Sequence, residues 1–181
     1  MDGLEYTYRL FEDFFSRKRI QRSFAMIDEV NVSGWEKWWQ IEFALFLSDD
    51  DDIAEWDMEV EFHTDLRKEK KKNYIAIDVS FRPKGLAKDK FIFLELKQNK
   101  DYVTCLRNML LDAEKVFNSH SKSLDGVKIR DFFVVGMYPS VEKKKITDCL
   151  MEIQKDYDVE VEKTEIKTKF IPNTDYSFTI F

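Results

Sequence analysis

Apolar residues recur along this chain with two different spacings, one helical and one strand-like. Residues 4–24 follow the helical spacing and predict an amphipathic helix that ends in a basic tail. A second helix is expected to begin at Ser33, because Ser33 and Glu36 have the spacing of a capping box. We expect it to end near Ser48, where an acidic run begins. Residues 55–65 then alternate between apolar and polar, which is typical of a strand.

The middle of the chain predicts two more strands and a return to helix. Residues 73–81 and 90–98 are strand-like runs on either side of a loop that contains Lys, Pro and Gly, so a hairpin is expected. Residues 101–118 place their apolar side chains on one helical face. Residues 127–139 are largely apolar and predict a central strand, and residues 140–157 predict another amphipathic helix.

The order of these segments predicts an α/β fold in which helices flank a mixed central β-sheet. The tail, residues 159–181, alternates and is expected to supply edge strands. A chain of 181 residues with five Gly, three Pro and no low-complexity linker is expected to form a single domain, 1–181.

Composition narrows the class of protein. Apolar residues make up 44% of the chain and charged residues 35%, which excludes a disordered chain and an ordinary membrane protein. No apolar run approaches the roughly 18 residues of a spanning helix. The N-terminus has no basic start followed by an apolar core, as a signal peptide would. We therefore expect a cytoplasmic protein with no membrane association.

The net charge of −6 argues mildly against a nucleic-acid-binding protein, because such proteins usually lean basic. Local patches decide phosphate attraction more than the sum does, however. Lys84, Lys88 and Lys90 gather in the hairpin loop. These three lysines are candidates for contacts with a nucleic-acid backbone.

The hairpin carries charged residues where a plain core strand would carry aliphatic ones. If its turn centres between Leu86 and Ala87, Asp78 lies directly across from Glu95. Directly opposed residues point to the same face, with Cβ atoms about 5 Å apart. Lys97, two residues after Glu95, shares that face. The pleat therefore gathers two carboxylates and one ammonium on one side of the sheet.

Such a group is chemically unusual unless it binds something. Two carboxylates at that distance raise the pKa of one of them unless a cation lies between them. Carboxylate oxygens suit Mg²⁺ or Mn²⁺. Lys97 adds a positive charge that can orient a water molecule or stabilise a developing oxyanion. A metal, carboxylates and a lysine together provide what phosphodiester hydrolysis needs.

Glu42 is the fourth candidate. On the helix that begins at Ser33, its same-face neighbours are Trp38, Trp39, Leu45 and Phe46. A free carboxylate in the middle of an apolar stripe is costly. Glu42 therefore either reaches the edge of the helix or points into a polar site.

Together these residues resemble the PD-(D/E)xK nuclease superfamily, which has the restriction-endonuclease-like fold. Its core is helix, three strands, helix, strand. Its signature is an acid on the second strand and E-x-K on the third, often with a Glu on the first helix. Here the matching residues are Asp78, Glu95-Leu96-Lys97 and Glu42, and the resemblance covers residues of about 33–139.

The sequence departs from the superfamily pattern in two places. Ile77 stands where the motif name has Pro, which is not a ligand. The helix at 101–118 lacks the Gln and Tyr pattern of the RecB-like branch. The helix at 4–24 and the C-terminal third are expected to be additions to the core.

The resemblance implies a Mg²⁺- or Mn²⁺-dependent nuclease, with DNA as the expected substrate. Asp78 and Glu95 would bind the metal, with the Leu96 carbonyl as a third protein ligand. Glu42 would bind it directly or through water, and Lys97 would position the attacking water. A homodimer or a protein partner would supply target specificity.

Two alternatives stay open from the residues alone. In the first, the chain is a catalytically inactive nuclease-fold module that binds nucleic acid or a protein partner. The net charge favours a protein partner. In the second it is a structural α/β domain, and Glu95 and Lys97 form an ion-pair row on an exposed strand. Metal titration separates the first from an enzyme, and burial of the two side chains tests the second.

Overall fold

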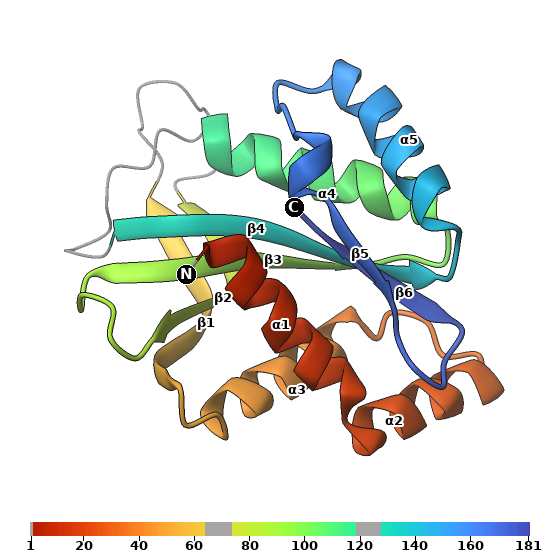
Figure 1. The fold of residues 1–181 in the computed structure, drawn as a ribbon, viewed down its shortest axis with the longest axis horizontal. Coiled ribbons are helices and arrows are strands. Elements are labelled where there is room, and N and C mark those ends of the chain that lie inside the picture. The colour runs from red at the N-terminus through yellow and green to blue at the C-terminus, as the bar shows by residue number, and fades with distance from the viewer. Residues whose placement is uncertain (1, 64–73, 119–127) are drawn as a thin grey trace.

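A mixed β-sheet forms the middle layer of the molecule, and helices cover both of its faces (Figure 1). The computed structural model describes residues 2–63, 74–118 and 128–181. Within these ranges the helices are α1 (Gly3–Ser16), α2 (Lys18–Glu29), α3 (Glu36–Ser48), α4 (Tyr102–Asn118) and α5 (Lys143–Ile153), with short 3₁₀ turns at Gln154–Asp156 and Lys163–Glu165. The strands are β1 (Ile53–His63), β2 (Tyr74–Pro83), β3 (Lys90–Gln98), β4 (Lys128–Pro139), β5 (Lys167–Phe170) and β6 (Tyr176–Ile180).

The strands lie in the order β1-β2-β3-β4-β6-β5. Strand β2 pairs antiparallel with both β1 and β3, whereas β3 and β4 are parallel. A parallel pair needs a crossover connection, and α4 provides it. Strand β6 then pairs antiparallel with both β4 and β5. The structure is therefore a mixed α/β fold, as the order of the predicted elements indicated.

The first three helices and the last two cover opposite faces of the sheet (Figure 1). On the α1–α3 side the core is aromatic. Phe11 stacks on Phe43, with ring centroids 4.2 Å apart, and Phe14 meets Phe43 edge-on at 5.3 Å. Each such pair adds about 0.5–1.5 kcal/mol beyond the area that it buries. No helix among the described residues is both long and apolar enough to cross a membrane.

Helix α4 lies unusually close to strand β4 at Gly136. A Cβ at this position would lie 2.2 Å from the Met109 sulfur and 3.0 Å from the Cys105 sulfur, so only a glycine fits without rearrangement. Gly136 is also the strand neighbour of Lys97 on β3. The contact that fixes the distance between α4 and the sheet therefore lies directly beside Lys97, the predicted catalytic lysine.

Most predicted elements are confirmed. The strands predicted at 73–81 and 90–98 are β2 and β3, and the helix at 101–118 is α4. The strand at 127–139 is β4, which lies inside the sheet between β3 and β6. The strand at 55–65 is β1, which begins at Ile53, and the last two predicted residues lie outside the described ranges.

The prediction of one helix over 4–24 is wrong, because the helix is interrupted at Arg17. This residue is extended, with φ −67° and ψ 123°, and separates α1 from α2. The Gln21 side-chain amide donates to the carbonyls of Phe15 and Ser16 at 3.0 and 3.2 Å. It therefore satisfies carbonyls that the end of α1 leaves without helical partners. The spacing of apolar residues continues from α1 into α2, so the sequence pattern does not reveal the break between them.

The predicted capping box at Ser33 is also wrong. Helix α3 begins at Glu36, and its N-cap residue is Trp35. The Glu36 carboxylate does not return to the helix terminus but accepts a hydrogen bond from the Gln98 backbone N–H at 2.8 Å. The side chain expected to cap the helix thus joins α3 to the end of β3.

The alternation of the tail predicts edge strands. Strand β5 is an edge strand, but β6 is not. Strand β6 lies between β4 and β5, and all five of its residues are buried. Its polar positions suggest a solvent-facing side, but their hydroxyls have internal partners. Ser177 contacts the Ser140 hydroxyl at 3.0 Å, and Thr179 contacts the Thr168 hydroxyl at 2.7 Å.

Replacing Gly136 with Ala should destabilise the protein by about 1–3 kcal/mol, the usual range for overpacking a core. The physical reason is the overlap of the new Cβ with Met109. Urea unfolding in a double-mutant cycle tests this cause. Gly136→Ala should cost less in a Met109→Ala background than in the wild type, and an equal cost in both backgrounds would show that this contact does not set the position of α4.

Candidate active site at the β2–β3 hairpin

The register of the hairpin decides which side chains meet. The paired residues are Val79 with Leu94, Ser80 with Phe93, and Phe81 with Ile92. This is the register predicted from a turn centred between residues 86 and 87. Extended by one residue, it places Asp78 opposite Glu95, and the ladder of paired residues ends just before that position.

The Asp78 carboxylate accepts a hydrogen bond from β3 at the position where the β2–β3 backbone ladder ends. The Leu96 N–H donates to Asp78 Oδ2 at 2.8 Å. The acceptor for this strand residue is thus a side chain of β2 and not a β2 carbonyl. The N–H and C=O of one strand residue point toward the same neighbouring strand. The Leu96 carbonyl therefore faces the same gap as the Asp78 carboxylate.

Strand β1 is irregular beside the same position. Glu59 has φ 54°, in the left-handed region, although it lies within a strand. Its neighbours Met58 and Val60 pair with Val79 and Ile77, but Glu59 forms no ladder pair with Asp78. A non-glycine residue in this conformation costs about 1–3 kcal/mol, and such strain gathers at functional sites.

Strand β2 also changes its packing at Asp78. Val79 belongs to the core on the α1–α3 side, whereas Ile77 packs with Phe93 and Val116 in a small cluster on the α4 side. Regular alternation would have kept Ile77 and Val79 on one face. The strand is therefore distorted at the residue that carries the carboxylate.

Lys97 joins strand β3 to helix α4. Its Nζ lies 3.3 Å from Glu95 Oε2 and 2.7 Å from Asp112 Oδ2. These three side chains and Asp78 line a cleft of about 660 Å³ between the hairpin and α4. Glu95 is only 6% exposed, so the pair is not an ion-pair row on an open surface. Lys115, one turn along α4, also contacts Asp112.

Sequence reasoning missed Asp112, although a signal was present. Met109 lies three residues before it and Val116 four residues after it, and both belong to apolar clusters. Asp112 is therefore a carboxylate on an apolar helical stripe, the same argument that singled out Glu42. Applied to the helix at 101–118, it would have found this residue.

The buried carboxylates disturb one another. Burial raises the pKa of Glu95 to about 8, with further increases from the charges of Asp78 and Asp112 and an opposing effect of Lys97. Burial lowers the pKa of Lys97, but the carboxylates of Glu95 and Asp112 outweigh it, so the net change is upward. The ammonium is therefore held charged in a cleft that contains more acids than it can neutralise.

Glu36 also belongs to this electrostatic group. Burial raises its pKa, and Asp78 and Asp112 add to the increase, while Lys97 and the Gln98 N–H oppose it. Glu36 lies at the first turn of α3, so that helix contributes a carboxylate near the hairpin through its N-terminus.

The structure does not bring Glu42 to the site. Its carboxylate forms an ion pair with Arg19 of α2. Six residues after Glu36, it lies roughly 9 Å farther along α3 and about 120° around the helix. Glu36 is therefore the carboxylate of this helix whose charge interacts with Lys97, Asp78 and Asp112, whereas Glu42 is paired with Arg19.

The three lysines of the hairpin loop are exposed but distant from the carboxylates. Lys84, Lys88 and Lys90 lie at the turn end of the hairpin. Five residues of strand separate this end from Asp78 and Glu95, which is about 16 Å. The loop can contact a long substrate that also reaches the cleft, but not the reacting group itself.

The chemistry of the donors fits a hard divalent cation, although the arrangement is not closed around one. Asp78, Glu95, Glu36 and the Leu96 carbonyl supply oxygen atoms, which Mg²⁺ and Mn²⁺ prefer. The raised pKa of Glu95 marks a carboxylate conflict that such a cation would relieve. Among the described residues, no group of three or more His, Cys, Asp or Glu side chains is positioned to hold a metal ion without movement.

Comparison with protein-family models, with curated proteins and with solved structures found no match to this chain. The interpretation of the site therefore depends on its geometry.

The raised pKa of Glu95 predicts a pH-dependent stability. Its folded pKa of about 8 lies above the ordinary 4.5, so the folded state binds the extra proton between these values. Stability should fall as pH rises through this window and level off above it. Without divalent cations, Glu95→Gln should gain stability over the wild type as pH rises from about 5 to about 8.

Denaturant unfolding across this pH range measures the difference. The exposed Glu152 on α5 offers a matched control, since Glu152→Gln makes the same chemical change away from the cleft. The Glu152→Gln offset should not vary with pH. A Glu95→Gln offset that is equally constant would show that Glu95 ionises normally in the folded protein.

Proposed function

We propose that this protein is a metal-dependent nuclease that hydrolyses phosphodiester bonds, with DNA as the expected substrate. The observation that carries the proposal is the arrangement of Asp78, Glu95 and Lys97 on one side of a splayed hairpin. Lys97 is charged, half-buried and within 3.3 Å of Glu95. A half-buried ammonium beside paired carboxylates supplies the charges that phosphodiester hydrolysis requires.

The order of elements supports a restriction-endonuclease-like core. Helix α3, strands β1, β2 and β3, helix α4 and strand β4 follow one another along the chain. This is the order helix, three strands, helix, strand of the PD-(D/E)xK superfamily. The acid lies on the second strand and E-x-K on the third, as that superfamily's signature requires.

Each site residue has a distinct role in this proposal. Asp78, Glu95 and the Leu96 carbonyl would hold Mg²⁺ or Mn²⁺, with Glu36 as the helical carboxylate in place of Glu42. The metal, when bound, would polarise the phosphoryl oxygen and lower the pKa of a bound water. Lys97 orients the attacking water and offsets the charge that grows on the phosphoryl oxygens.

Asp112 acts on Lys97 in the proposed enzyme. Its carboxylate, on α4, lies 2.7 Å from the Lys97 ammonium and keeps the lysine from turning fully toward Glu95. A fixed position for the charge is what makes such a group effective in a transition state.

Substrate binding would extend beyond the cleft. The exposed Lys84, Lys88 and Lys90 would contact backbone phosphates at the far end of the hairpin. A homodimer or a protein partner would supply target specificity.

One observation favours a second candidate, a catalytically inactive nuclease-fold module that binds nucleic acid or a protein partner. Lys97 is already paired with both Glu95 and Asp112. In the inactive module, a lysine paired in this way would tie the sheet to α4. In that case the module would bind its partner without any requirement for Mg²⁺.

A nuclease assay with Mg²⁺ and Mn²⁺ on single- and double-stranded DNA and RNA distinguishes the two. The wild type should cleave at least one substrate, and Asp78→Asn and Glu95→Gln should abolish cleavage. Lys97→Ala should reduce the single-turnover rate by about 10²-fold or more, the scale for losing one preorganised group. Its nucleic-acid affinity should stay within a few-fold of the wild type, because the lysine acts mainly in the transition state.

Binding without cleavage by the wild type on every substrate would favour the inactive module. Equal losses of affinity and rate in Lys97→Ala would remove the catalytic role of the lysine.

The two glutamates of α3 form a matched pair for metal binding. Glu36→Gln should weaken Mn²⁺ affinity, because it removes a charge near the cleft while its amide oxygen still accepts the Gln98 N–H. Glu42→Gln makes the same change at the Arg19 ion pair and should leave the affinity unchanged. Calorimetric titration of both variants gives the answer, and equal affinities would exclude Glu36 from the metal site.

A further inference from the structure

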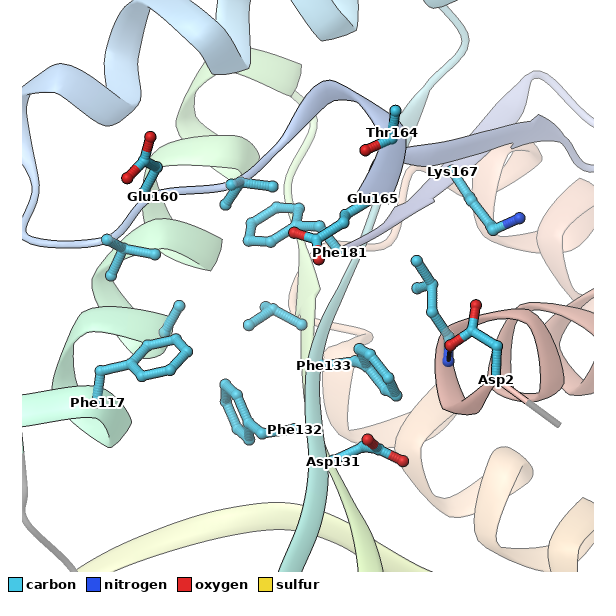
Figure 2. A pocket seen from close by; sticks show the side chains of 15 residues that line it. Asp2, Phe117, Asp131, Phe132, Phe133, Glu160, Thr164, Glu165, Lys167 and Phe181 are labelled. Atoms are coloured by element: carbon cyan, nitrogen blue, oxygen red, sulfur yellow. Dashed lines mark hydrogen bonds between the residues drawn. The ribbon is translucent and has the colours of Figure 1, made fainter.

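A second cavity lies beside the C-terminal half of α4, away from the carboxylate cleft. Its volume is about 420 Å³, within the usual range for small-ligand sites. It is bounded by α4, the first half of β4, the segment 159–165 and the last residue, Phe181 (Figure 2).

Helix α4 separates the two cavities. Asp112 and Val116 line the carboxylate cleft, whereas Ala113 and Phe117 line the second cavity. Each pair is four residues apart, so each forms one stripe along the helix. The second cavity is thus a separate feature that the proposed nuclease chemistry does not use.

The wall of this cavity is strongly aromatic. Phe117, Phe132 and Phe181 lie on the α4 side of β4, and Figure 2 shows Phe133 on the other side of that strand. Phe117 is 66% exposed, so part of this aromatic surface faces solvent. Aromatic faces carry negative charge density and attract cations, most strongly where water is excluded.

The charges around the cavity are predominantly negative. Asp2, Asp131, Glu160 and Glu165 line it, and Figure 2 shows Glu165 above the rings near its centre. Lys167 also lines it, but its ammonium lies 2.6 Å from Glu5 and 5.3 Å from the centre of the Tyr8 ring. The lysine is therefore engaged on the α1 side.

We propose that this cavity binds an apolar organic cation, such as an aromatic or methylated ammonium. The aromatic wall would take the apolar body of the ligand, and its charge would lie between the rings and the carboxylate of Glu165. Phosphate and carboxylate ligands are disfavoured, because they would meet Glu160 and Glu165, whereas Asp131 is already paired with Arg130 at 3.3 Å. A neutral apolar ligand would fill the cavity but supply no counter-charge for the carboxylates of Glu160 and Glu165.

Benzyltrimethylammonium is a suitable probe, with benzyl alcohol as the neutral analogue and phenylacetate as the anionic one. Titration followed by NMR should show the cation binding at least 10-fold more tightly than the alcohol, with no binding of phenylacetate. A peptide that carries one trimethyllysine, titrated in parallel, shows whether a side chain or a free molecule is the better source of the cation.

The double variant Glu160→Gln/Glu165→Gln should weaken binding of the cation by about 10-fold and leave the alcohol unaffected, since about 1.4 kcal/mol of electrostatic attraction corresponds to that factor. Both residues are exposed. The change at Glu165 should not disturb folding, because an amide oxygen can still accept the hydrogen bond that the Glu162 N–H donates to this side chain. Glu152→Gln is the matched control and should change nothing.

Three results would overturn the proposal. They are no binding of either cation at about 10 mM, equal affinity for the cation and the alcohol, and unchanged affinity in the double variant.

Discussion

The hairpin and the two helices near it depend on a single electrostatic balance, in which the Lys97 ammonium lies among buried and half-buried carboxylates. Breaking a buried ion pair by removing one partner costs several kcal/mol, because the other charge stays buried. Without the lysine, Glu95 and Asp112 would repel each other across the space between β3 and α4. Placing α4 over β3 therefore costs free energy unless a cation lies in the cleft or its acids take up protons.

The rest of the fold offsets the free-energy cost of this arrangement. The strained Glu59 lies on β1, and the carboxylates with raised pKa values lie on β3 and at the start of α3. Aromatic packing on the α1–α3 face offsets this cost, because rings of α1 and α3 stack against each other there. Gly136 links the two regions, because the close approach of α4 that it permits also brings Asp112 within reach of Lys97.

Local patterns predicted the frame of the site, and tertiary contacts decided the rest. The alternation of β2 and β3 and the position of their turn were enough to place Asp78 opposite Glu95. The helical carboxylate was misplaced, because Glu36 fits a capping box equally well in the sequence and its partner, Gln98, lies far along the chain. The distortion of β2 at Asp78 leaves no mark in the sequence, since Ile77 and Val79 alternate regularly there. Asp112 could have been found, because its apolar neighbours on α4 are visible from spacing alone.

The excess of acids in the cleft has a consequence for the proposed enzyme that does not depend on the identity of its substrate. Glu36, Asp78, Glu95 and Asp112 outnumber the two lysines beside them, Lys97 and Lys115, so a phosphodiester would be repelled from the free protein. A divalent cation reverses the sign of the local charge and removes that repulsion. Metal and substrate must then each increase the affinity for the other by the same factor, since their coupling free energy is reciprocal. The distant lysines of the hairpin loop carry no such requirement, because no carboxylate of the cleft lies near enough to oppose them. Encounter with nucleic acid would thus begin at the loop without metal, and only entry into the cleft would require it.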